Sequence, residues 1–253
     1  NGALVSSPTV TTAKGTLTVT AYDPVTGKVT YSYTLTDDQT HAAGQGDNST
    51  TGPLFDDLDV VLTDYDNQPA SGTLSVKIVD DVPDAKNDTD TVKAGTQSET
   101  GNVITGVGTN EGPGGLGTDV KGADGATVTQ IESATGGTKA VSTTGTTEID
   151  GQYGKLKIAA DGSYTYTRDA GTPGNVDDVF TYTLKDGDGD ADTAKLTIKI
   201  ENGTPTITDL TPKASGGDTT VYEDGLPDGS LPTTDRETNT GDFTITSPDG
   251  VKS

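Results

Sequence analysis

Cysteine, methionine and tryptophan are absent from this chain, and histidine occurs once. Without cysteine, the fold has neither disulfide bonds nor thiolate ligands for a metal ion. A single histidine excludes zinc sites built from several imidazoles and any catalytic triad that uses histidine as its base. That residue, His41, lies in the polar stretch 36–53, and we expect its side chain to be solvated.

Basic residues are also few: 16 Lys and Arg face 39 Asp and Glu, which gives a net charge of −23. A surface that binds phosphate needs a basic patch, so nucleic acid and anionic membrane are poor partners for this chain. No apolar run approaches the roughly 18 residues of a membrane span, and we expect no membrane insertion of this region. Divalent cations such as Ca²⁺ are the obvious means of neutralising the excess carboxylates.

Large aliphatic residues are scarce as well, since Leu, Ile, Val and Phe make up only 46 of 253 residues. Such a composition with high net charge is typical of intrinsic disorder. The pattern contradicts that interpretation, because Thr alternates with Val, Ile and Tyr in short runs of period two, as half-buried strands require. No stretch shows a sustained helical period. The sequence therefore predicts an all-β protein with almost no helix.

Two of the clearest strands belong to a repeated unit. Residues 62–83 align without gaps with residues 184–205, and both segments end at a proline, which resists continuing a central strand. Self-similarity of this kind indicates a tandem array. Upstream, Gly15-Thr-Leu17 corresponds to Gly154-Lys-Leu156, and each is followed by Tyr-x-Tyr-Thr.

The repeat predicts three segments: an incomplete unit over 1–83, a complete unit over 84–205 and the beginning of another over 206–253. Many short strands separated by Gly, Pro and Asp turns, in a unit of this size, favour an antiparallel β-sandwich. We therefore expect tandem antiparallel β-sandwich domains.

The strongest candidate for a metal site is Asp186-Gly-Asp188-Gly-Asp190-Ala-Asp192. Oxygen ligands at every second residue, with glycines that permit tight curvature, suit the six to eight oxygens around Ca²⁺. The alternative is a solvated acidic hairpin turn, which Asp and Gly also favour.

Four further carboxylates are candidates by their place in the repeat. Asp64 and Asp66 are the poorer counterpart of the acidic motif in the first unit. Asp56 aligns with Asp178 just before the preceding strand, where either carboxylate can supply a ligand across a loop. A charge at the edge of a strand is the alternative for this last pair.

The string Asp178-Val-Phe-Thr-Tyr-Thr-Leu-Lys-Asp186-Gly-Asp-Gly-Asp, followed by a Leu-x-Ile-x-Ile strand and a proline, resembles VCBS-type and cadherin-like repeats. Residues 221–230 resemble the opening of another repeat of the same large proteins, the repeats-in-toxin adhesins of bacteria. The resemblance implies immunoglobulin-like sandwiches, calcium at loops and domain junctions, type I secretion to the cell surface, and a role in attachment or biofilm formation.

Acid-rich linkers resemble the calcium-bridged junctions of such arrays. Around Pro83 the candidate ligands are Asp80, Asp81, Asp84 and Asp88. Glu223 and Asp224 are candidates for the next junction. A flexible polar linker is the alternative at both places.

These observations favour a stiff extender module of an adhesin, with neighbouring repeats as its partners. A carbohydrate- or peptide-binding module of the same adhesin is the alternative, although the missing Trp argues against a sugar-stacking surface. No nucleophile elbow, P-loop or metalloprotease motif is present, so we do not expect an enzyme. The two incomplete ends also suggest head-to-tail self-association, in which residues 206–253 of one molecule complete residues 1–83 of the next.

Overall fold

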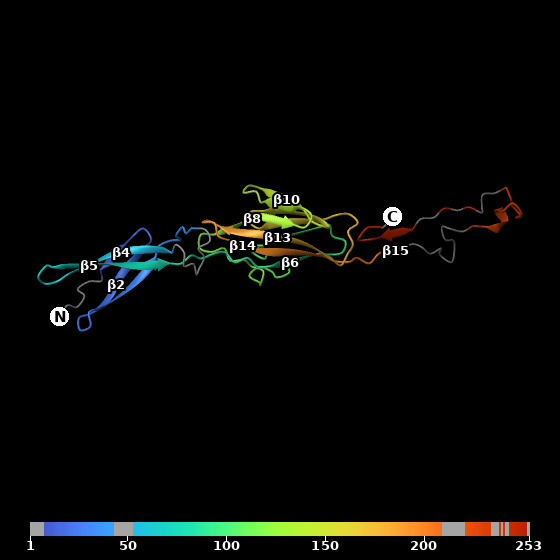
Figure 1. Cartoon of the computed structure of the whole chain (residues 1–253). Helices are drawn as coiled ribbons and strands as arrows, with labels where there is room; N and C mark the ends of the chain where they lie inside the picture. Colours follow the sequence, from blue (N-terminus) through green and yellow to red (C-terminus); the bar gives the residue numbers. More distant parts are fainter. Residues whose placement is uncertain are drawn as a thin grey trace.

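The computed structural model describes residues 8–42, 53–208, 221–233, 238, 240 and 243–251. The described part is all-β, as expected, and its only helical element is the 3-10 turn η1 at Glu223–Gly225. No helix in these residues is long and apolar enough to span a membrane. Three groups of strands follow one another along one direction (Figure 1).

The middle group, which we call the central unit, contains two sheets with the strand orders β10-β11-β12-β7 and β6-β14-β13-β8-β9. Its strands are β6 (Asp88–Val92), β7 (Ser98–Asn102), β8 (Ala126–Ser133), β9 (Gly137–Ala140), β10 (Thr146–Asp150), β11 (Gly154–Ala159), β12 (Ser163–Arg168), β13 (Val176–Asp186) and β14 (Ala191–Ile200).

The core of the central unit arises from the alternation seen in the sequence. Strand β11 buries Leu156 and Ile158 and exposes the two lysines between its apolar positions. Buried side chains from both sheets form one hydrophobic cluster, in which the rings of Tyr166 and Phe180 meet edge to face with centroids 6.1 Å apart. This shared core compensates for the small number of apolar residues in the chain.

One pairing differs from the antiparallel arrangement that the sequence predicted. Strand β6 pairs with β14 in parallel, so this sheet is mixed. β6 begins the central unit and β14 ends it, and the intervening strands provide the long connection that a parallel pair requires.

The N-terminal segment contains β1 (Thr9–Thr11), β2 (Gly15–Asp23), β3 (Lys28–Leu35), β4 (Leu54–Thr63) and β5 (Pro69–Ile78). Its sheets, β1-β2-β3 and β4-β5, repeat the pairing of β10-β11-β12 and β13-β14 in the same register. Leu17 lies opposite Tyr33 as Leu156 lies opposite Tyr166. The repeat found in the sequence is thus a repeat of strand pairing.

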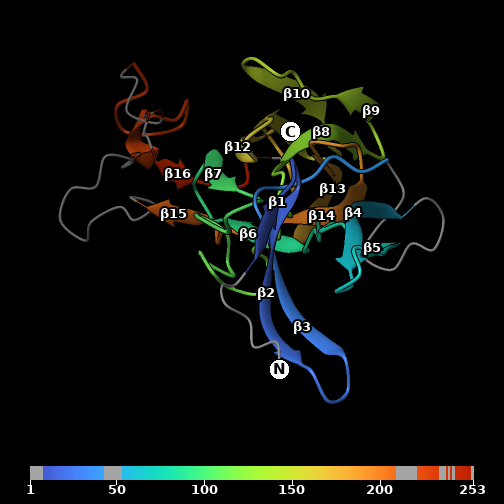
Figure 2. The same ribbon diagram turned by 90° about the vertical axis from the view of Figure 1, so that its left-hand side faces the viewer.

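The N-terminal segment buries much less of its apolar surface than the central unit. Among the described residues, no strand flanks β3, β4 or β5 where β7, β8 and β6 flank their counterparts. Leu62 is consequently 69% exposed, whereas Leu184 at the equivalent position is fully buried. The tips of the β2–β3 and β4–β5 hairpins also diverge (Figure 2).

The C-terminal segment contains the short antiparallel pair β15 (Thr206–Thr208) and β16 (Thr244–Thr246), with η1 farther along the molecule (Figure 1). The side chains of both strands are exposed.

Candidate metal centre

The acidic motif predicted to bind a metal forms the tight turn between β13 and β14. The Oδ1 atom of Asp186 accepts hydrogen bonds from the backbone N–H groups of Gly189 (2.8 Å) and Asp190 (2.7 Å). Gly189 has φ +117°, a conformation that residues with a Cβ rarely adopt. The turn therefore uses one oxygen of Asp186 for its own structure and leaves Oδ2 for another partner.

A third carboxylate reaches this turn from the loop before β8. Asp124 Oδ2 accepts a hydrogen bond from the backbone N–H of Asp188 at 3.1 Å. Ligand oxygens of Asp124, Asp186 and Asp188 all lie within 4.8 Å of one another. Carboxylate oxygens gathered in this way suit a hard cation such as Ca²⁺.

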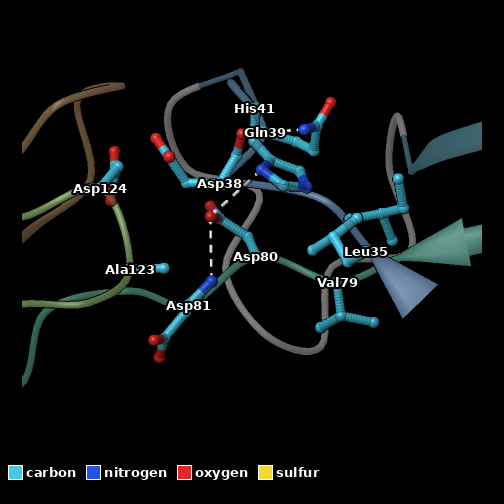
Figure 3. A pocket seen from close by; sticks show the side chains of 10 residues that line it. Leu35, Asp38, Gln39, His41, Val79, Asp80, Asp81, Ala123 and Asp124 are labelled. Atoms are coloured by element: carbon cyan, nitrogen blue, oxygen red, sulfur yellow. Dashed lines mark hydrogen bonds and ion pairs between the residues drawn. The ribbon is translucent and has the colours of Figure 1, made fainter. Parts of the chain in front are cut away.

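The N-terminal segment adds Asp80, which follows β5, and His41, from the loop after β3. His41 donates its backbone N–H to Asp188 Oδ2 at 2.9 Å, and its Nδ1 lies 3.2 Å from Asp80 Oδ1. Both side chains point into a hollow between the two units that Asp38 and Asp124 also line (Figure 3). Potential ligand atoms of His41, Asp80 and Asp188 lie within 4.8 Å of one another.

We call these five residues, together with Asp190, the boundary cluster: His41, Asp80, Asp124, Asp186, Asp188 and Asp190. Asp190 belongs to it because its carboxyl group lies beside that of Asp80 and raises the pKa of Asp80. Two predictions made separately from the sequence, the acidic turn and the junction acid Asp80, thus meet at one place.

The boundary cluster contains buried polar atoms that lack a hydrogen-bond partner. They include Asp80 Oδ2, Asp186 Oδ2 and Asp188 Oδ1, together with Nε2 of His41. A buried carboxylate without a compensating partner costs several kcal/mol. Burial, reinforced by the neighbouring Asp190, raises the pKa of Asp80 to about 6 even though His41 opposes the change. A bound cation would satisfy the oxygens and remove this cost.

Asp178 and Asp56 do not lie in the boundary cluster. Asp178 is buried between the sheets, where it accepts hydrogen bonds from the Tyr166 hydroxyl (3.0 Å) and from two backbone N–H groups. Asp56 accepts bonds from the hydroxyls of Tyr33 (2.6 Å) and Thr12 (2.5 Å), which lower its pKa. Their alignment in the repeat thus reflects a shared Tyr–Asp link between sheets.

Asp64 and Asp66 lie in the exposed turn between β4 and β5. Asp64 Oδ1 accepts the backbone N–H groups of Asp66 and Gln68, as in an ordinary Asx turn. Neither residue belongs to a group of three potential metal ligands among the described residues.

The remaining acids near Pro83 also have local partners. Asp81 is exposed, and its backbone N–H donates a hydrogen bond to Asp80 Oδ1 at 3.0 Å. Asp84 forms an ion pair with Lys86 at 2.5 Å. Asp192, from the end of the acidic motif, accepts the backbone N–H of Ala85 at 2.8 Å.

Asp88 is fully buried inside the central unit, away from the boundary cluster. Its Oδ2 lies 3.4 Å from the hydroxyl of Tyr182, and that hydroxyl also donates a hydrogen bond to Asp119. Burial, followed by the negative charges of Asp119 and Glu111, raises the pKa of Asp88 to about 8.

The boundary between the central unit and the C-terminal segment has a different chemistry. The buried Arg168 donates from Nη2 to Asp249 Oδ1 at 2.8 Å, and Asp249 Oδ2 accepts the N–H of Gly203 at 2.8 Å. Glu223 and Asp224, predicted as ligands here, instead form η1, which lies beyond β15 (Figure 1).

Sequence reasoning missed two members of the boundary cluster. Asp124 had a weak signal, because Asp124-Gly recurs as Asp249-Gly in the C-terminal segment, and both aspartates contact a unit boundary. His41 was expected to be solvated, and that expectation is wrong: its side chain is only 5% exposed. No local feature marks it, because its partners come from other elements.

Searches against known protein families and against curated proteins find no match to this chain. The geometry of the boundary cluster is therefore the basis for assigning a function.

Proposed function

We propose that this chain is a calcium-stiffened extender segment of a secreted, cell-surface bacterial adhesin. The observation that carries the proposal is the boundary cluster, which gathers buried carboxylates from two consecutive units. An ion bound there joins the acidic turn of the central unit to Asp80 of the N-terminal segment. Fixing one unit against the next is what a long, stiff spacer requires.

The donor set fits calcium. Asp124, Asp186 and Asp188 offer only oxygens, and Asp80 reaches the same cluster from the other unit. The unpartnered oxygens of Asp186 and Asp188 are available to a cation without breaking any hydrogen bond of the turn. In the proposed role calcium neutralises these charges and restricts the motion between the two units.

The arrangement of the strands supports a spacer built from immunoglobulin-like β-sandwiches. Two sheets of the central unit share one core, and the N-terminal segment repeats their pairing. Secretion to a calcium-rich exterior agrees with the acidic composition. Attachment or biofilm formation as the role of the whole protein is what the resemblance of the repeats to those of adhesins implies.

Spin labels test the stiffening directly. The chain has no native cysteine, so Ser71→Cys on β5 and Thr138→Cys on β9 place one label on each unit. We expect the distance distribution between the labels, measured by double electron–electron resonance, to narrow when Ca²⁺ is added and to broaden in chelator. Asp188→Asn should abolish the change, whereas Asp59→Asn, which removes an exposed charge from β4, should preserve it. Equal widths with and without Ca²⁺ would overturn the proposal.

A further inference from the structure

The boundary cluster contains one donor that calcium does not need. His41 is the only histidine of the chain, and its imidazole is 5% exposed among carboxylates that are equally buried. Both of its ring nitrogens, Nδ1 and Nε2, are buried without a hydrogen-bond partner, and Nδ1 lies 3.2 Å from Asp80 Oδ1 and 3.9 Å from Asp188 Oδ2. No hydrogen bond therefore accounts for the burial of this imidazole, and Nδ1 faces the two carboxylates.

Backbone contacts fix the position of the imidazole. The N–H of His41 donates to Asp188 Oδ2, a residue 147 positions away in the chain. The ring is therefore held beside the acidic turn by its own main chain. Asp80 faces the ring from the N-terminal segment (Figure 3). Such positioning lowers the entropic cost of binding an ion.

The potential ligands divide into two groups that share Asp188. Asp124, Asp186 and Asp188 form a group of oxygens only, and all three come from the central unit. His41, Asp80 and Asp188 form a mixed nitrogen and oxygen group, to which each unit contributes. Calcium prefers oxygen, whereas imidazole suits borderline transition metals such as Zn²⁺.

We propose that His41, Asp80 and Asp188 form a second cation site that binds a borderline transition-metal ion of the Zn²⁺ class, beside the oxygen-only site for calcium. Asp188 has two oxygens and lies in both groups, so one carboxylate can serve both ions. The inference extends the proposed function, because the second ion links the units through His41 and Asp80. Occupancy of the mixed site would then couple the rigidity of the spacer to the supply of transition metal.

Calorimetric titration of the full chain with ZnCl₂, in the presence of saturating Ca²⁺, tests the proposal. We expect one Zn²⁺ to bind without release of Ca²⁺. His41→Gln should weaken Zn²⁺ binding at least about tenfold, since even an outer-shell partner contributes roughly 10–100-fold to metal affinity. The same variant should keep its calcium stoichiometry. Asp124→Asn should instead weaken Ca²⁺ binding and leave Zn²⁺ binding unchanged.

Because the chain has one histidine, its imidazole gives a single set of NMR signals. We expect Zn²⁺ to shift one imidazole nitrogen strongly and Ca²⁺ to leave both nearly unchanged. Displacement of Ca²⁺ by Zn²⁺ one for one, or an unchanged imidazole spectrum in Zn²⁺, would overturn the second site and leave the calcium proposal intact. If Zn²⁺ bound through His41 but the chain did not bind Ca²⁺, the second site would stand and the calcium proposal would be overturned.

Discussion

At the scale of single residues, the same Tyr–Asp pair occurs in both repeats with different burial. Tyr166 donates to Asp178 inside the closed core, whereas its counterpart Tyr33 donates to Asp56 in the half-open N-terminal segment. A hydrogen bond to a buried charge contributes about 1.5–3 kcal/mol. Comparing the two pairs therefore shows how burial changes the contribution of the same hydrogen bond to stability.

We predict that Tyr166→Phe lowers the free energy of unfolding of the central unit by about 1.5–3 kcal/mol. The matched change Tyr33→Phe should cost less, because Tyr33 is only half-buried whereas Tyr166 is fully buried. Urea titrations of both variants, followed by tyrosine fluorescence and circular dichroism, measure the two losses. Equal losses would show that burial does not set the strength of this link.

The buried Asp88 predicts a dependence of stability on pH. Its pKa in the fold is about 8, raised above the usual value of 3.8 mainly by burial. The unfolded chain therefore ionises Asp88 first, and its contribution to stability, fully present below about pH 4, is lost as the pH rises to about 8. The loss is at most about 1.4 kcal/mol per pH unit.

We expect Asp88→Asn to flatten this part of the stability profile. Thermal unfolding of the wild type and the variant at several pH values between 5 and 8, in chelator to remove metal effects, gives the comparison. Parallel profiles would contradict a raised pKa for Asp88. Asp80 and Asp119 titrate in the same interval in both proteins, with pKa values of about 6, so the difference isolates Asp88.

At the scale of elements, the turn between β13 and β14 supplies three acids of the boundary cluster. Its geometry requires Gly189, whose φ is +117°. We predict that Gly189→Ala costs about 1–3 kcal/mol and weakens Ca²⁺ binding, because the turn must change shape around Asp186. The control Gly72→Ala, in exposed strand β5, meets no atom within 4 Å of the added Cβ.

Calorimetry and thermal melts of these two glycine variants test the role of the turn. An unchanged calcium affinity in Gly189→Ala would show that the turn tolerates the new residue without moving its ligands. An effect of Gly72→Ala of the same size would show that both changes act through the unfolded chain.

At the scale of the whole molecule, the two boundaries of the central unit differ in what holds them. The first has the boundary cluster, whereas the second has the ion pair of Arg168 and Asp249. A guanidinium is always charged at neutral pH and needs no dissolved ion. The geometry of the second boundary should therefore not depend on calcium.

We predict that chelator broadens the distance distribution across the first boundary only. Labels at Thr138→Cys and Thr244→Cys, on β9 and β16, report on the second boundary. Their distribution should stay unchanged in chelator and broaden with Asp249→Asn. Equal broadening of both boundaries in chelator would contradict the distinction.

Head-to-tail self-association stays a prediction at this scale. Exposed apolar residues such as Leu62 and Tyr31 on the N-terminal segment agree with a missing partner. We expect the sedimentation coefficient of the full chain to rise with concentration and that of a chain shortened after Thr204 to stay constant. The same behaviour in both chains would exclude completion by residues 206–253.

The acidic turn was predictable because its carboxylates are close together in the chain. Asp186, Asp188 and Asp190 lie on one hairpin, and Asp and Gly determine the curvature of that hairpin locally. The assignments of Asp56 and Asp178 had less support, because alignment in a repeat does not distinguish a metal ligand from a buried partner of tyrosine. Both of these carboxylates accept tyrosine hydroxyls in the structure.

The all-β class and the repeated register of the strands follow from the order of residues, because period-two alternation sets which face of a strand is buried. Which polar residues meet depends instead on how the strands and loops pack in the folded chain. His41, Asp80, Asp124 and Asp188 come from four separate stretches of the chain, and no local pattern relates them. They converge because the N-terminal segment ends against the acidic turn, which brings an isolated histidine into a buried group of carboxylates.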